Sequence, residues 1–175
     1  MRDDRGFSLL ELLIVVVVIS VLMVVAIDRL LRLRFAAERV MVETMVSGLR
    51  SALYIEFAGA AVRGQSEAMA AARGSNPITR LSEHPATYAG EFFGPDPAGF
   101  APGSWYFDTR ERNLVYVVRF PEQFVSALGA PARARFTVVP DYDDLDGNGR
   151  FDAGRESMRG LRLVPVEPFS WREAR

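Results

Sequence analysis

The longest apolar stretch of the chain lies near its N-terminus. Residues 7–27 read FSLLELLIVVVVISVLMVVAI, and only Ser8, Glu11 and Ser20 interrupt the apolar series. At about 1.5 Å per residue, a helix over this stretch spans roughly the ~30 Å hydrocarbon core of a bilayer. A strand is excluded by length, because strands rarely exceed about 10 residues. The pattern therefore predicts a membrane-spanning helix.

The helical pattern continues past this stretch. Neither proline nor glycine occurs between Phe7 and Ser47, so no local signal ends the helix. Apolar side chains then recur at spacings of three and four and form one face of the helix. This face comprises Val42, Met45, Val46, Leu49, Ala52, Leu53 and Phe57. We expect residues 7–28 to form the transmembrane helix and residues 29–58 its amphipathic continuation into a globular head.

Turn residues dominate the next part of the chain. Residues 59–103 are rich in glycine and proline and are predicted to be a connecting loop, with a short alanine-rich helix over residues 66–73. Residues 104–175 carry strand patterns, and residues 121–129 are expected to form one helical turn. The predicted strands are residues 104–108, 113–120, 134–139 and 160–166. Pro165 marks an edge strand or a strand end.

These elements together predict an α+β fold. A long N-terminal helix, half membrane-spanning and half amphipathic, packs on a small antiparallel sheet of about four strands. Within the sheet region, residues 141–156 form an acidic, glycine-rich loop.

Composition removes most enzyme classes. The formal net charge is −1, and all 21 basic residues are arginine. Without lysine there is no P-loop, Schiff base or lysine general base, and without cysteine there is no thiolate nucleophile, disulfide or cysteine-ligated zinc. The single histidine, His84, excludes paired-histidine metal sites, and no G-x-S-x-G motif occurs. We expect no enzymatic activity, assign no catalytic residue and find no sign of a nucleic-acid partner.

The acidic loop has the spacing of a calcium-binding loop. Counted from Asp144, oxygen-bearing side chains fall at positions one, three, five and nine, and Gly149 holds position six, where such loops turn sharply. Position twelve, where the pattern has a bidentate acidic ligand, is Arg155, and Glu156 follows it. The predicted Ca²⁺ ligands are Asp144, Asp146, Asn148, the Arg150 carbonyl, Asp152 and Glu156. Magnesium fits less well, because it retains more of its waters. The alternative is a solvated acidic turn.

The N-terminal residues resemble a known signature. Gly6-Phe7-Ser8-Leu9-Leu10-Glu11, followed by the long apolar helix, is similar to the type IV prepilin motif of type IV pilins and type II secretion pseudopilins. The resemblance implies a leader of residues 1–6, cleavage after Gly6 by a prepilin peptidase, and methylation of the new N-terminal residue, Phe7. It also implies that Glu11 pairs with the N-terminal ammonium of a neighbouring subunit during assembly.

The resemblance implies a non-enzymatic structural subunit of a type II secretion or type IV pilus filament. The absence of a cysteine pair favours a pseudopilin or minor pilin. Its implied partners are the prepilin peptidase, other pilin or pseudopilin subunits, the inner-membrane assembly platform and the lipid bilayer. The implied location is the bacterial inner membrane, with the N-terminus cytoplasmic and the head periplasmic or extracellular. The alternative is a stand-alone single-pass anchored domain that binds calcium or a ligand outside the cytoplasm.

The charges that flank the apolar stretch are unusual for this orientation. Before it, two arginines are offset by Asp3 and Asp4. After it, arginines outnumber the acids Asp28 and Glu38. These arginines are Arg29, Arg32, Arg34 and Arg39. The positive-inside rule alone would place the N-terminus outside, whereas cytoplasmic cleavage in the resembled family places it inside. Our predicted orientation follows the resemblance.

Overall fold

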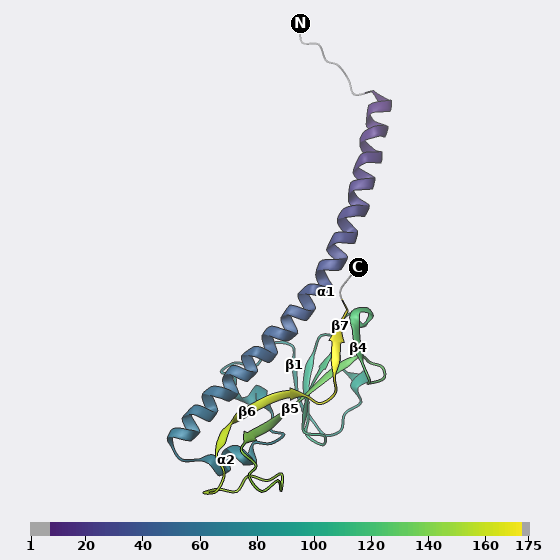
Figure 1. Ribbon diagram of the computed structural model, residues 1–175. Coiled ribbons are helices and arrows are strands. Elements are labelled where there is room, and N and C mark those ends of the chain that lie inside the picture. The colour runs from purple at the N-terminus through teal and green to yellow at the C-terminus, as the bar shows by residue number, and fades with distance from the viewer. Residues whose placement is uncertain (1–7, 173–175) are drawn as a thin grey trace.

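The structure is a computed structural model that describes residues 8–172. A single helix, α1 (Leu9–Val62), runs from the start of this range into the head. Its N-terminal half projects away from the head, and its C-terminal half lies along the sheet (Figure 1). The helix continues through Asp28 without a break, which confirms the predicted continuity. Gly6 and Phe7, with the rest of the predicted leader, lie outside the described residues.

The head contains two sheets. The larger has the strand order β1-β2-β3-β5-β6, and the smaller pairs β4 with β7 at the end of the head nearer the free part of α1 (Figure 1). The strands are β1 Tyr88–Phe92, β2 Trp105–Asp108, β3 Asn113–Val117, β4 Phe124–Ser126, β5 Arg133–Tyr142, β6 Met158–Pro165 and β7 Phe169–Trp171. The short helices are α2 Ser66–Ala71 and the 3-10 turns η1 Pro77–Arg80, η2 Pro97–Gly99 and η3 Pro121–Gln123.

The α+β class is confirmed, but the sheet differs from the prediction. Strand β1 lies inside the segment that was expected to be a connecting loop, and it pairs in parallel with β2, so the larger sheet is mixed. The remaining pairs of that sheet are antiparallel. The expected helical turn over residues 121–129 ends at Gln123 and is followed by β4. Pro165 ends the edge strand β6, as predicted, because a missing N–H is tolerated there.

The core lies between α1 and the larger sheet. The predicted apolar face of the helix is confirmed: Val42, Val46, Leu49 and Leu53 are buried, and Met45 and Phe57 pack at its margin. From the sheet, this face meets buried side chains of β2, β3, β5 and β6. They include Trp105, Leu114, Tyr116, Phe136 and Leu163. On a second, smaller apolar cluster, Phe100 covers Tyr106, with ring centroids 3.9 Å apart. The head therefore holds the second half of α1 by apolar packing.

Candidate functional site

The N-terminal site is a carboxylate in an otherwise apolar helix. Ser8 is the N-cap of α1, and its side-chain oxygen accepts a hydrogen bond from the Glu11 N–H at 3.1 Å. This cap starts the helix directly after the predicted cleavage position and places Glu11 in the first turn. The Glu11 side chain is exposed, and within the described residues no hydrogen bond or ion pair engages its carboxylate. Gly6 and Phe7, its predicted companions, lie outside the described residues.

The apolar helix around Glu11 is uncovered. Within residues 8–172, α1 is the one helix long and apolar enough to cross a membrane, and none of its most apolar window is buried by the rest of the chain. Leu9 exposes 86% and Val24 69% of its surface. Soluble monomers rarely expose a continuous apolar patch of this extent. The covering material is therefore lipid or other protein, as for a membrane anchor.

The acidic loop brings three of the six predicted metal ligands together. One carboxylate oxygen from each of Asp144, Asp146 and Glu156 lies within 4.8 Å of the others. Glu156 is buried, and its two oxygens accept hydrogen bonds from the N–H groups of Leu145 at 2.8 Å and Asp152 at 3.0 Å. These two bonds fix the Glu156 carboxylate beneath the loop. Clustered carboxylates repel one another, and a hard divalent cation relieves that repulsion.

The other predicted ligands are arranged less directly. The side-chain N–H₂ group of Asn148 donates to Asp146 at 2.9 Å and to Asp152 at 3.1 Å. The Asn148 side-chain oxygen accepts from the Arg150 N–H at 2.7 Å. In this arrangement Asn148 bridges two carboxylates by donation, and Asp152 stands outside the three-carboxylate cluster. Asn148 must rotate its amide to offer oxygen to a cation at the cluster.

The backbone of the loop has the expected tight turns. Gly147 and Gly149 both have φ of 71°, a left-handed conformation that glycine adopts without strain. The Gly149 N–H donates to Asp144 at 3.0 Å, which closes the loop on its first acid. Arg155, at position twelve, is exposed, whereas the next residue, Glu156, is buried in the cluster. The calcium-loop pattern has an acid at position twelve. In this loop the nearest acid is Glu156, one residue later in the sequence.

Sequence reasoning missed a buried carboxylate at the point where the free part of α1 meets the head. Glu38 exposes 4% of its surface. It accepts hydrogen bonds from the Tyr116 hydroxyl at 2.7 Å and from the N–H groups of Arg119 at 2.6 Å and Phe120 at 3.0 Å. Burial raises the pKa of Tyr116 above its ordinary value, and the hydrogen bond to Glu38 adds to this, so the phenol remains a donor. Glu38 therefore ties α1 to the end of β3.

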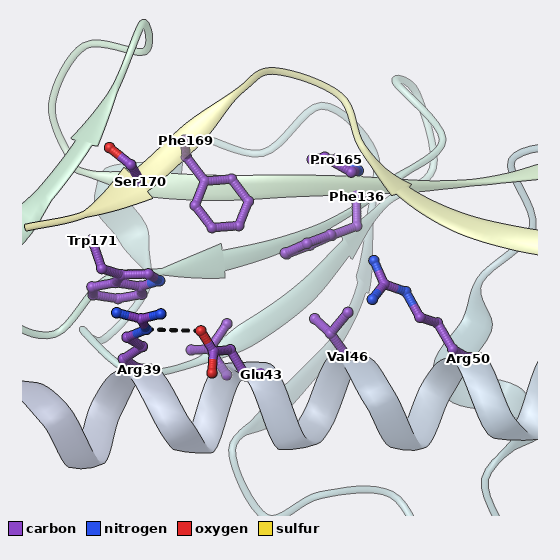
Figure 2. A pocket seen from close by; sticks show the side chains of 10 residues that line it. Arg39, Glu43, Val46, Arg50, Phe136, Pro165, Phe169, Ser170 and Trp171 are labelled. Atoms are coloured by element: carbon purple, nitrogen blue, oxygen red, sulfur yellow. Dashed lines mark hydrogen bonds and ion pairs between the residues drawn. The ribbon is translucent and has the colours of Figure 1, made fainter.

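A groove of about 410 Å³ opens beside this junction, between α1 and the strands β5, β6 and β7. Figure 2 shows Phe136, Phe169 and Trp171 above the helix, with the Arg39–Glu43 ion pair, 2.8 Å between nitrogen and oxygen, at one end. The Trp171 indole N–H is buried without a hydrogen-bond partner in the described residues. Among the described residues that line the groove, the charged ones are Arg39, Glu43 and Arg50.

The comparisons with known proteins concern the N-terminal segment. No curated protein and no solved structure matches the chain. One family model does match, over residues 1–27, and it describes the prokaryotic N-terminal methylation motif. This range includes Gly6, Phe7 and Glu11 and ends where the apolar stretch ends. The chain therefore carries the N-terminal signature of the type IV pilins and pseudopilins, joined to an α+β head.

Proposed function

We propose that the chain is a pilin-like structural subunit, a pseudopilin or minor pilin, of a type II secretion or type IV pilus filament. A prepilin peptidase cuts it after Gly6 and methylates Phe7. The observation that carries this proposal is the methylation motif, which leads directly into an uncovered apolar helix. The subunit is non-enzymatic, and it sits in the bacterial inner membrane before assembly, with its head outside the cytoplasm.

The uncovered helix suits both stages of this life cycle. In the membrane its apolar surface is covered by lipid, and in a filament it is covered by the same helix of other subunits. Glu11 is the exposed carboxylate within this surface. Cleavage after Gly6 creates an ammonium at Phe7, and an ammonium from a neighbouring subunit neutralises Glu11 where water is excluded. This pair sets the axial offset between subunits.

The mature N-terminus tests the proposal. Mass spectrometry of the chain from its native membrane is expected to find N-methylated Phe7 as the first residue. Gly6→Val is expected to retain the leader, because a β-branched side chain crowds the peptidase site. Gly48→Val is the matched control, since Gly48 lies on the exposed face of α1 with no atom within 4 Å of an added Cβ. A chain that begins at Met1, or after Ala26, contradicts the proposal.

The alternative is a stand-alone anchored domain that binds calcium or a ligand. An unprocessed chain that never enters filaments favours this alternative. The two functions share the anchor and the head, so processing and assembly are the properties that separate them.

We also propose that the acidic loop binds Ca²⁺ in either case. Asp144, Asp146 and Glu156 supply the charged ligands, and Asn148, Arg150 and Asp152 supply further oxygens after rotation of the Asn148 amide. Support comes from the convergence of the three carboxylates and from the burial of Glu156 at the closing position. In a pilin without cysteine, a bound cation takes over the role of a cross-link in the C-terminal part of the head.

Thermal unfolding of the detergent-solubilised chain tests the calcium proposal. A ligand that binds the folded state at ~100-fold excess over Kd stabilises it by roughly 2.7 kcal/mol, so Ca²⁺ is expected to raise Tm and Mg²⁺ to raise it much less. The double variant Asp144→Ala with Asp146→Ala is expected to lose the shift. Asp141→Ala is the control, because Asp141 pairs with Arg159 outside the cluster. No shift at millimolar Ca²⁺ means that the loop is only a solvated turn.

A further inference from the structure

Four arginines lie near the place where α1 leaves the head. Arg29 and Arg34 lie on the helix, Arg119 follows β3, and Arg172 follows β7, and all four are exposed. In Figure 1 the β4–β7 end of the head faces the free part of α1. We propose that these four residues form an arginine collar that binds the phosphates of anionic phospholipids and seats the head on the membrane surface.

The position of the collar along α1 matches the lipid headgroups. The apolar stretch ends at Ile27. At ~1.5 Å per residue, Arg29 lies about 3 Å and Arg34 about 10 Å beyond that point. The headgroup layer is roughly 5–8 Å thick on each side of the bilayer, and the Debye length is about 8 Å at physiological ionic strength. The helical arginines therefore lie within or at the edge of the phosphate layer.

The head reaches the same level. The Phe35 and Phe120 rings contact each other at 5.4 Å between centroids, so α1 already touches the head at this level. Arg119 precedes Phe120, and the Arg172 N–H donates to the Gln123 carbonyl at 2.7 Å, which brings Arg172 beside η3. Arg34, Arg119 and Arg172 thus lie near the same end of the head, and Arg29 precedes them on α1.

The collar side chains are held in place and free to bind. The Arg34 guanidinium lies 4.6 Å from the centroid of the Phe120 ring, and a guanidinium above a ring keeps its in-plane N–H fork available for phosphate. Arg119 lies over Gly103, where a Cβ would come within 2.6 Å of its guanidinium. Within residues 8–172, no ion pair or side-chain hydrogen bond engages the guanidinium of any collar residue.

Nearby carboxylates leave the collar positively charged. Glu43 pairs with Arg39, whereas the three donors to Glu38 are neutral groups that do not cancel a carboxylate charge. Among the described residues, Asp28, Glu38 and Glu122 are the other acids near the collar, and the four collar arginines outnumber them. Binding to lipid phosphates gives a role to the arginines that follow the apolar stretch, whose position the positive-inside rule does not explain. The inference depends only on the anchor, on either side of the membrane, and does not depend on processing or filament assembly.

The test uses the whole chain reconstituted in vesicles of phosphatidylglycerol or phosphatidylcholine. Since the chain has no cysteine, one can be introduced at exposed Ala127, after β4, and labelled with a fluorophore; Ala153 in the acidic loop serves as the distal reference site. Quenching by a nitroxide-bearing lipid reports how closely each label approaches the surface. We expect stronger quenching at position 127 in phosphatidylglycerol than in phosphatidylcholine. High salt should remove this difference, and position 153 should show none.

Removing two collar charges should release the head. Each arginine near an anionic surface contributes about a five-fold factor, so Arg34→Gln with Arg119→Gln is expected to lower the ratio of seated to released head about 25-fold at low salt. The same pair changed to lysine keeps the charge and should retain most of the quenching, which separates lost charge from lost folding. Arg63→Gln with Arg155→Gln, at the other end of the head, is the matched control.

Three outcomes overturn the inference. The first is equal quenching at position 127 in the two lipids. The second is wild-type quenching in the glutamine pair. The third is quenching that rises with the protein-to-lipid ratio regardless of lipid charge, because it would assign the collar to a second copy of the chain. An unprocessed N-terminus, by contrast, refutes the filament proposal and leaves this result unchanged.

Discussion

Replacing Glu11 with valine is expected to abolish incorporation into filaments while the protein still enters the membrane. A carboxylate inside an apolar span costs on the order of 1–3 kcal/mol during insertion, so its removal makes insertion easier. Assembly should fail because the ammonium at Phe7 of the neighbouring subunit loses its partner in a water-poor environment. Membrane extraction measures insertion, and shearing followed by immunoblotting measures assembly.

Two further variants separate charge from bulk. Glu11→Gln keeps the size of the side chain and should also fail to assemble. Glu43→Val removes an exposed glutamate from the same helix, where Glu43 pairs with Arg39 on the surface, and should assemble normally. Normal incorporation of Glu11→Val would refute the pairing role of this carboxylate.

Replacing Glu38 with alanine is expected to cause a large loss of stability in the head. The Tyr116 hydroxyl and the N–H groups of Arg119 and Phe120 would all lose their acceptor at a buried site. Buried donors without partners cost about 1–3 kcal/mol each, and partial hydration reduces the sum to about 2–4 kcal/mol. We expect Tm of the detergent-solubilised chain to fall by about 10 °C.

The control for this experiment is Glu43→Ala. The Arg39–Glu43 ion pair is exposed, with more than half of the Glu43 side chain accessible to solvent. Its removal should therefore lower the free energy of unfolding by less than about 1 kcal/mol. Tyr116→Phe removes one of the three donors to Glu38. Its loss of stability should lie between those of Glu43→Ala and Glu38→Ala. If the Glu38→Ala and Glu43→Ala variants unfold at the same temperature, Glu38 does not hold α1 to the head.

The long helix was predictable because its signals are local. Spacings of three and four select one face, and the absence of proline and glycine before Gly48 removes every stop signal. The same applies to the β2–β3 hairpin, in which Asp108 pairs with Asn113 across a short polar turn. In each case the residues that determine the element lie within a few positions of one another in the sequence.

The missed features depend on distant residues. Glu38 finds its partners 78 to 82 positions away, so in the sequence it resembles any surface glutamate on a helix. Strand β1, with the sequence YAGEF, has no buried residue and therefore no strong hydrophobic signal, and its parallel pairing with β2 decides its structure. The small sheet joins β4 to β7 across more than forty residues, which no local pattern indicates.

The acidic loop lies between these cases. Its spacing predicted a metal site, and the structure gathers Asp144, Asp146 and Glu156. Spacing alone did not decide which acid closes the loop, because that depends on burial. Glu156 is drawn under the loop by two backbone N–H groups, whereas Arg155 faces solvent. The calcium ligands themselves stay a prediction.

The unbroken course of α1 has a mechanical consequence. A helix of 54 residues is about 81 Å long, and about half of it is clamped to the head by the core and by Glu38. No proline or loop interrupts it between the apolar end and the clamp. An axial displacement or rotation of the apolar end is therefore transmitted to the head without a flexible joint in between. The apolar end and the head therefore move as one body, and a displacement of the first becomes a displacement of the second.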